Sequence, residues 1–329
     1  FSTNSTSSGS ASNRYVAAGG GNGNKQTKGY TVTPKFEWRV GNLLVEGSVA
    51  TSYSDNTYNN LRKGRAGNAQ TNNLTGIQFT ATRSNEFSGD WNFVQTGGLD
   101  WTDLENYTNP RITDDVRHVE DEINAAKLDF TYNMNTKYPV VLRAGVKRRE
   151  QTTNSDRTSD IMRWNYIGPG GGSSGSWEAY PSLFTFNPAA LGPTFKSVNG
   201  GGVPAYTDRE ATGKLFLSNP EYFTPGYNAT HYFNAKFGNV RRFQEDVTAY
   251  YVMGNAQLGK LTIQAGVRYE DTATNSEEFD PLLPSEVKAA GYSVVTSTGR
   301  ASTPEGLDYQ YTTKPKVNRK GSYDRYHPS

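Results

Sequence analysis

Few residues of this sequence are arranged for catalysis. The three histidines, His118, His231 and His327, do not have the spacing of a metal-ligand set. Adjacent carboxylates such as Glu120-Asp121 and Glu277-Glu278 could act as general acid and base only inside a cleft that removed one of them from water. The sequence indicates no such cleft, so both pairs are interpreted as solvated loop residues.

Two further segments have the composition of a ligand site without its motif. Asp100, Asp103 and Glu105 could bind calcium, but the residue order of an EF-hand is absent. Residues 168–175 are rich in Gly and Ser but lack the Lys-Ser/Thr pair of a phosphate-binding loop, which favours a flexible external loop. No catalytic residue, metal or cofactor is therefore predicted, and the protein is predicted not to be an enzyme.

A binding role is indicated instead by aromatic residues that crowd residues 151–242. Aromatic rings stack on sugar faces or flat chelators, and charged neighbours fix the orientation of the bound molecule. The predicted solute-binding residues are Arg163, Trp164, Tyr166, Trp177, Glu178, Tyr180, Phe184 and Phe186. The alternative is that these rings pack the loop against itself, and the sequence leaves both interpretations open.

The composition favours an all-β fold that could position such residues. The 329 residues are rich in Gly, Tyr, Asn, Thr and Ser, poor in aliphatic residues and free of cysteine. The net charge of +2 and the scattered basic residues exclude a nucleic-acid footprint. No apolar run approaches the roughly 20 residues of a membrane helix, so a membrane location would require a closed β-barrel.

Apolar and polar residues alternate with a period of two in three hairpins. Residues 30–40 and 43–53 flank Gly41-Asn42, a two-residue turn that places Val40 opposite Leu43. The same pattern occurs in residues 126–134 with 140–146, and in 250–258 with 261–269. The segments Leu142–Lys147 and Ile263–Arg268 also share a layout in which an inward Gly is followed by a base two residues later.

The charged residues of these hairpins fall on one predicted face. The predicted lumen-lining residues are Lys35, Glu37, Arg39, Glu46, Lys127, Asp129, Arg143, Lys147, Arg268 and Glu270. The opposite face would then contact lipid, where a basic side chain at the bilayer midplane costs about 2 to 4 kcal/mol. Tyrosines such as Tyr30, Tyr53 and Tyr269 at the strand ends would form the aromatic girdle, although the β-propensity of Tyr is an alternative explanation.

Alternation alone also suits a soluble β-sandwich, so the connection lengths decide between the two folds. Tight turns alternate with the long connections 54–121, 151–242 and 271–316. This sorting is typical of outer-membrane barrels, whose long loops lie outside the cell. Seven to nine strands are predicted, starting after an external loop at residues 1–28 and ending with a strand that begins near Tyr323. Residues 74–97 could supply either two barrel strands or a hairpin within a loop.

The segment Ala265-Gly266-Val267-Arg268-Tyr269-Glu270-Asp271-Thr272, with the preceding strand from Asp246 and the turn at Gly259-Lys260, resembles the barrel hairpin of TonB-dependent receptors. The terminal segment from Tyr323 is similar to a strand entry of that family, with His327 where Leu is usual. The resemblance implies a barrel of about 22 strands. It also implies a plug domain, a segment that contacts the TonB complex and C-terminal strands, none of which is seen in this chain.

The predicted fold is thus an all-β, antiparallel transmembrane β-barrel, with residues 1–329 as part of one barrel domain and 151–242 as a long extracellular loop. The predicted function is uptake of a scarce small molecule or oligosaccharide, such as a siderophore, corrinoid or saccharide, across the outer membrane of a Gram-negative cell. The expected partners are outer-membrane lipid, the plug domain and the TonB complex. A passive porin and a soluble β-sandwich binding module remain as alternatives, and the sequence does not identify the ligand.

Overall fold

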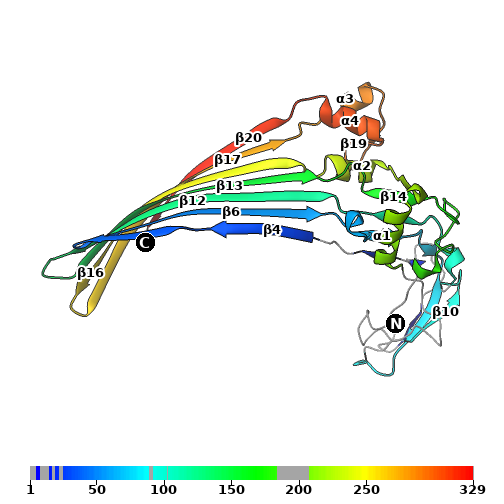
Figure 1. The fold of residues 1–329 in the computed structure, drawn as a ribbon, viewed down its shortest axis with the longest axis horizontal. Helices are drawn as coiled ribbons and strands as arrows, with labels where there is room; N and C mark the ends of the chain where they lie inside the picture. Colours follow the sequence, from blue (N-terminus) through cyan, green and yellow to red (C-terminus); the bar gives the residue numbers. More distant parts are fainter. Residues whose placement is uncertain are drawn as a thin grey trace. The chain divides into compact units, whose positions relative to one another are not determined.

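The computed structural model describes residues 5–7, 15–16, 19–21, 25–88, 92–101, 103–183 and 207–328 (Figure 1). The chain divides into two compact units, which are described separately. The loop unit comprises Phe1–Asn24, Tyr58–Val116 and Ser159–His231, and the wall unit comprises Lys25–Thr57, Arg117–Thr158 and Tyr232–Ser329. Two of the three long connections of the sequence therefore form most of a body of their own, and the third, 271–316, belongs to the wall unit.

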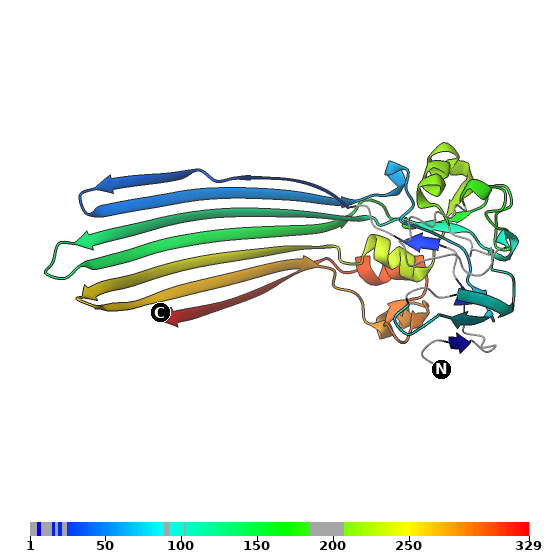
Figure 2. The ribbon, with the colours of Figure 1, turned by 90° about the horizontal axis from the view of Figure 1, so that it is seen from below.

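The wall unit is an eight-stranded antiparallel sheet whose long strands lie side by side (Figure 2). The order is β20-β17-β16-β13-β12-β6-β4, and β5 also pairs with β6. The strands are β4 Lys25–Val32, β5 Lys35–Val40, β6 Leu43–Tyr58, β12 Arg117–Met134, β13 Val140–Arg157, β16 Arg241–Leu258, β17 Leu261–Glu278 and β20 Val317–Pro328. The predicted antiparallel strands and their number are confirmed.

The tight turns set the register that the sequence predicted. Val40 pairs with Leu43 and Leu258 with Leu261. Gly41 and Gly259 adopt φ values of 56° and 61°, a left-handed conformation that Gly tolerates without steric cost. Because both turns require this conformation at their first residue, Gly at these positions fixes the pairing of every residue that follows.

The strands are longer than the alternating patterns predicted, and one is interrupted. β12 begins at Arg117 rather than at 126, and β13 continues to Arg157, so the long connection covers 158–240 rather than 151–242. Backbone pairing continues where both faces have become polar. The strand predicted at 30–40 is broken at Thr33-Pro34, because Pro has no N–H for the ladder; the Pro34 carbonyl still accepts a 3.1 Å bond from Val49.

Successive tight turns are staggered in the register. Leu43 pairs with Tyr132, two residues before β12 ends at Met134, and Val140 pairs with Ala256, two residues before β16 ends at Leu258. The offset of two residues per hairpin corresponds to a stagger of one residue per strand. With about 3.3 Å per residue and 4.8 Å between strands, turns at a common level require the strands to tilt by roughly 35°, within the range of membrane barrels.

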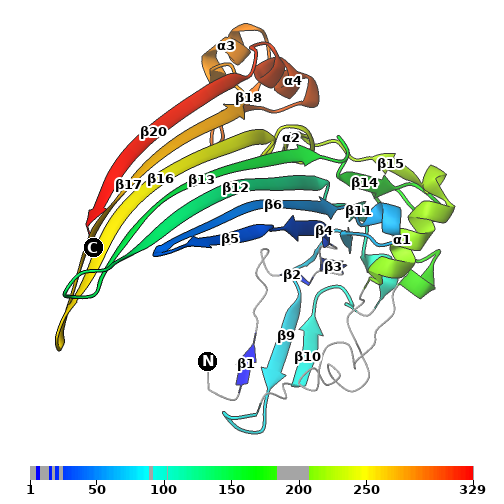
Figure 3. The same cartoon turned by 60° about the vertical axis from the view of Figure 1, so that its left-hand side comes forward.

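The loop unit contains three small antiparallel sheets. The largest has the order β15-β14-β11-β7-β3, from Phe223–Pro225, Arg163–Tyr166, Arg111–Thr113, Asn68–Gln70 and Gly19–Gly21. The others pair β1 Ser5–Ser7 and β10 Asn92–Gly97 with β9 Gln78–Thr82, and β2 Tyr15–Val16 with β8 Leu74–Thr75 (Figure 3). Residues 74–97 therefore contribute a hairpin within the connection and no strand of the wall. Residues 89–91 of this range lie outside the described residues.

Short helices complete both units. The loop unit contains the 3-10 turns η1 Leu61–Lys63, η2 Leu104–Asn106, η3 Pro181–Leu183 and η5 Pro220–Tyr222, the helix α1 Arg209–Ser218 and the start of α2 Ala229–Lys236. The connection 279–316 of the wall unit holds α3 Pro284–Ala289, β18 Val294–Val295, β19 Arg300–Ala301 and α4 Pro304–Thr312. In the part of the chain that the structure describes, no helix has both the length and the apolar character to cross a membrane.

Candidate functional site

The sheet of the wall unit has one charged face and one apolar face. Residues paired across an antiparallel ladder point to the same side, and neighbours along a strand alternate. Glu37 pairs with Glu46, which pairs with Asp129, and Lys127 pairs with Lys147. By these rows and by alternation, all ten predicted lumen-lining residues share one face. That this face lines a lumen remains a prediction.

Asp129 organises the centre of this charged face. Its carboxylate accepts a hydrogen bond from the Tyr251 hydroxyl at 2.8 Å and forms an ion pair with the Lys127 ammonium at 2.5 Å. Asp129 is only 8% exposed. Arg268 and Glu270 form a second pair at 2.5 Å on the same face. A concavity of about 250 Å³ next to this pair is lined by Lys147, Arg149, Glu245, Val247, Ala249, Arg268, Glu270, Thr272 and Tyr323. Asp129 and Glu270 are thus each paired with a basic residue of the wall itself.

Gly145, one of the two predicted inward glycines, makes the Asp129 contacts possible. A Cβ atom at this position would lie 2.5 Å from the Asp129 carboxylate and 2.5 Å from the Tyr251 ring. The Gly145→Ala variant should therefore break the Tyr251–Asp129 bond, destabilising the wall by about 1 to 3 kcal/mol in a urea unfolding titration. Gly254→Ala is the matched control, since its Cβ would meet only Leu142 at 3.4 Å. Equal stabilities of the two variants would contradict this role.

The opposite face exposes large apolar side chains along every hairpin. Phe36, Trp38, Val252 and Ile263 are between 48% and 56% exposed. Phe130 pairs with both Val45 and Ala144, and Val252 with both Ala144 and Val267, so the apolar rows are continuous across the strands. A continuous exposed apolar surface of this kind is what contact with lipid requires.

Tyrosine rings lie on this face where the apolar residues end. Tyr30 stacks on Tyr53 with ring centroids 5.8 Å apart, and Tyr269 lies 5.0 Å from Tyr326. The Tyr53 hydroxyl donates a 2.9 Å hydrogen bond to Glu120. Each ring thus has an apolar side and a polar tip, the property that places Tyr at a membrane interface. The girdle interpretation remains a prediction.

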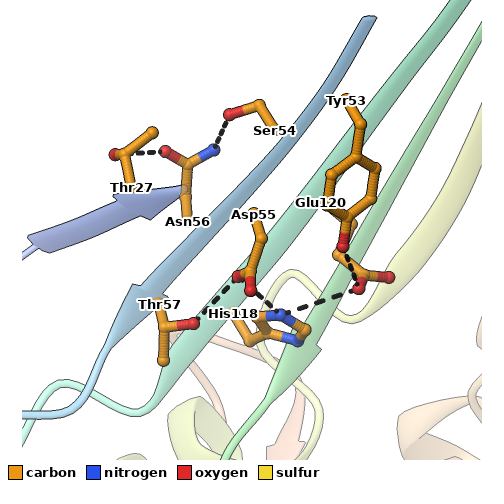
Figure 4. A network of polar contacts seen from close by, with 8 residues as sticks. All are labelled: Thr27, Tyr53, Ser54, Asp55, Asn56, Thr57, His118 and Glu120. Carbon is orange, nitrogen blue, oxygen red and sulfur yellow. Dashed lines mark hydrogen bonds and ion pairs between the residues drawn. The ribbon is translucent and has the colours of Figure 1, made fainter. Parts of the chain in front are cut away.

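Beyond the tyrosines the sheet is polar on both faces, as Figure 4 shows. On the Tyr53 side, His118 lies 3.1 Å from Asp55 and 4.0 Å from Glu120, and Thr57 donates to Asp55 at 2.9 Å. On the other side of β6, Thr27 donates to Asn56 and Asn56 donates to Ser54. These contacts stabilise strands that continue past the apolar surface.

The other candidate chemical residues have structural roles. Glu120 and Asp121 are neighbours on a strand and point to opposite faces, so they cannot act together on one substrate. Asp103 caps η2 by accepting the Glu105 N–H at 3.0 Å. Residues 168–175, predicted to be a flexible loop, form a hydrogen-bonded turn against Tyr166, in which Ser176 donates to Gly170 at 2.7 Å. Within the described ranges no three His, Cys, Asp or Glu residues are grouped to hold a metal ion.

Two of the predicted solute-binding rings lie in the core of the loop unit. Tyr166 and Trp177 are 1% and 0% exposed, with ring centroids 4.6 Å apart. They pack in a cluster with Leu61, Ala66, Ala69, Ile112, Leu183, Leu215 and Phe223. For these two residues the alternative interpretation is correct: they hold the loop together and present no free ring face to a solute.

The remaining predicted binding residues are distributed differently. Trp164 and Tyr180 are partly buried and pack against this core, Trp164 on Phe216 at 5.1 Å. Glu178 is exposed, and Phe184 and Phe186 lie outside the described residues. A solute-binding role for Trp164, Glu178, Tyr180, Phe184 and Phe186 stays a prediction. Arg163 belongs to a second, polar face of the same sheet.

Apart from Arg163, the residues of that polar face were missed by sequence reasoning. Ile112 and Trp164 of β11 and β14 point into the core, so Arg111, Arg163 and Asn165 point to the other side, where Arg111 pairs with Asn165. His231 of α2 adjoins them, since both arginines lower its pKa. The period-two pattern Arg163-Trp164-Asn165-Tyr166 was the signal in the sequence, but its strand is only four residues long.

Comparisons with known proteins agree with this wall. Residues 217–283 match the profile of an outer membrane protein beta-barrel family. The chain is similar to the ferric-catecholate import receptor Fiu of E. coli K12 in an open and a closed form, at 14% identity and TM-scores of 0.38 and 0.39, covering 92% and 93% of this chain and 33% and 30% of the receptor. The siderophore receptor PiuA of Acinetobacter baumannii matches at 10% identity and a TM-score of 0.31, covering 92% of this chain and 39% of the receptor.

The chain spans about a third of the length of these receptors. No curated protein sequence matches it. The sheet and the family profile together confirm the predicted fold class, an antiparallel outer-membrane β-barrel of which this chain forms part of the wall.

Proposed function

We propose that this chain is the middle part of the barrel of a TonB-dependent outer-membrane receptor that takes up a scarce solute with energy from the inner membrane. The proposed solute is a siderophore, a corrinoid or a saccharide. The proposed partners are the surrounding lipid, a plug domain inside the barrel and the TonB complex. In this proposal the apolar face contacts lipid and the charged face lines the lumen.

The observation that carries the proposal is the contrast between the two kinds of connection. Tight turns such as Gly41-Asn42 join the strands at one end, while the connections at the other end fold into a body with its own aromatic core. A passive pore needs only one constricting loop. A folded body that is distinct from the wall unit supplies the surface that capture of a dilute solute requires.

The charges of this face support the proposal that a plug domain fills the lumen. Buried charges need partners, and several on this face already pair within the wall, as Lys127 does with Asp129 and Arg268 with Glu270. Others, including Arg143 and Lys147, would pair with groups of the plug domain in the complete protein. Uptake would then depend on an energised movement of the plug, which would release the captured solute inward.

Deletion of the loop unit from the full-length protein tests this function. Because β3, β7, β11, β14 and β15 share one sheet, residues 1–24, 59–116 and 159–231 must be replaced together by short linkers. We expect high-affinity uptake to be lost, while the barrel still assembles, as measured by heat-modifiable electrophoretic mobility, because loops contribute little to the hydrogen-bonded wall.

The control for this experiment is collapse of the proton gradient in cells with the intact protein. Energised uptake must stop after the collapse, although surface binding of the solute continues. Uptake that survives either the deletion or the collapse would identify a passive porin instead.

A further inference from the structure

The polar face of the loop-unit sheet contains buried nitrogen atoms without partners. The Nε atoms of Arg111 and Arg163 and the Nδ1 atom of His231 are shielded from solvent and form no hydrogen bond with the residues that the structure describes. The side-chain oxygen of Asn165, next to Arg163, is equally buried and unbonded. Native proteins rarely leave such groups unsatisfied, so a cluster of four marks a candidate binding site.

The charges of this cluster define what the occupant must be. Among the described residues, no carboxylate forms an ion pair with Arg111, Arg163 or His231. Burial lowers the pKa of both guanidinium groups, and repulsion by Arg163 lowers that of Arg111 further. Burial also lowers the pKa of His231, as do Arg163 and Arg111, the charged groups that face it. An anion would relieve all of these unfavourable interactions at once.

The surrounding backbone holds the cluster in place. The Arg111 Nη1 atom donates to the Asn72 side chain at 3.1 Å and to the Asn109 carbonyl at 3.2 Å, which leaves its Nε–H directed elsewhere. Gly226 donates its N–H to the Arg163 carbonyl at 2.8 Å. A Cβ at Gly226 would lie 2.9 Å from the Asn165 oxygen and 3.0 Å from Arg163 Cγ, so only Gly leaves room for both side chains.

We propose that Arg111, Arg163, Asn165 and His231 form a binding site for an oxyanion, a carboxylate or phosphate-like group carried by the solute. The Nε–H donors of both arginines lie buried on one face of the sheet, close enough to His231 for their charges to act on its ring. Guanidinium groups suit planar or tetrahedral oxyanions. Rotation of the Asn165 amide by a half-turn would present its NH₂ group as a further donor. This site rests on the proposed function and gives the solute a negative charge.

The charged face of the wall unit also carries more basic than acidic residues near the loop connections. On the loop-side halves of β12, β13, β16, β17 and β20, the residues on this face include Asp121, Glu245, Glu270 and Glu278 against Arg117, Arg149, Arg157, Arg241, Arg319 and Arg325. The opposite face of the same halves is acidic, with Glu120, Glu122, Glu150, Asp156, Asp246, Asp271, Glu277 and Asp324 against Arg148, Arg242 and Lys320. The excess of arginine on the predicted lumen side favours the passage of anions.

Calorimetric titration of the purified full-length protein tests the site directly. Sulfate is the probe for a phosphate-like group, because it remains a dianion across the pH range used, and acetate is the probe for a carboxylate. Arg163→Gln and Arg111→Gln should each weaken binding of the preferred probe about 10- to 100-fold, because each removes a charged hydrogen bond. Arg62→Gln, a change of the same charge at an exposed position of the loop unit, should leave binding unchanged.

Binding should also depend on pH through His231. Burial and the two arginines lower its pKa, so at about pH 7.5 the ring is neutral, and it gains its proton only below its ordinary value of about 6.5. Sulfate affinity should therefore rise as the pH falls toward about 5.5. His231→Gln should remove this rise without abolishing binding, a readout that a purely structural role would not change.

The outcomes separate the site from the function. Wild-type affinity in Arg163→Gln, equal losses in Arg62→Gln, or an unchanged pH profile in His231→Gln would each overturn the site. If Arg163→Gln fails to fold, as judged by the near-ultraviolet signal of Trp177, the pH profile of His231→Gln decides alone. A protein that binds sulfate through these residues but transports nothing would contradict the receptor function and leave the site intact.

Discussion

A Val252→Arg variant of the full-length protein is expected to lose about 2 to 4 kcal/mol of folding free energy in lipid vesicles. Val252 is 53% exposed in the middle of the apolar rows, where it pairs with Ala144 and Val267. A guanidinium group at this position would be removed from water without a partner. Urea titration of the protein folded into vesicles measures the loss.

Met253→Arg is the matched control, because Met253 is the next residue of the same strand and pairs with Arg143 and Gly266 on the charged face. Its cost should stay below about 1 kcal/mol, the size of a repulsion between like charges on paired strands. A larger loss in Met253→Arg than in Val252→Arg would reverse the assignment of the faces. Free aqueous labelling of Phe130→Cys and Ile263→Cys in the assembled protein would reject the lipid contact altogether.

The second large effect is expected in the loop unit. Trp177→Ala should destabilise this unit by about 3 to 5 kcal/mol, because Trp177 is fully buried against Tyr166 and Phe223 and its removal leaves a cavity. The wall should be unaffected, because the wall has its own ladder of backbone hydrogen bonds. Limited proteolysis of intact cells should therefore cleave the loops of the variant while the barrel remains resistant.

Leu217→Ala provides the comparison within the same unit. Leu217 lies on α1 and is 52% exposed, so its truncation should change the loop stability by less than about 1 kcal/mol. Proteolysis of Trp177→Ala at the wild-type rate would show that Trp177 is not a core residue. That result would reopen the prediction that this ring binds the solute.

The wall was predictable because its determinants are local. A Gly-initiated turn of two residues fixes the register, and the alternation of side chains then assigns every following residue to a face. The ends of the strands were not predictable in this way. β12 and β13 continue to Arg117 and Arg157 through residues that are polar on both faces, where only the backbone ladder marks the strand.

The loop unit could not be predicted because its contacts are non-local and its strands are short. Asn68–Gln70, Arg111–Thr113 and Arg163–Tyr166 are three or four residues each, too few for a periodic pattern to be distinguished from chance. The residue types in this segment suited both a binding surface and a core. The burial of Tyr166 and Trp177 assigns these two rings to the core. Their burial depends on partners such as Ala69 and Ile112, which lie far away in the sequence.

The order of the loop-unit sheet also limits how this protein can be altered or can diverge. β11, from the connection between β6 and β12, lies between β7 of the same connection and β14 of the next one. Neither connection can therefore be exchanged alone, since a graft from a relative would lose the neighbouring strand that completes its sheet. Substitutions in 59–116 should therefore covary with substitutions in 159–231. A change of ligand specificity would require both segments to be exchanged together.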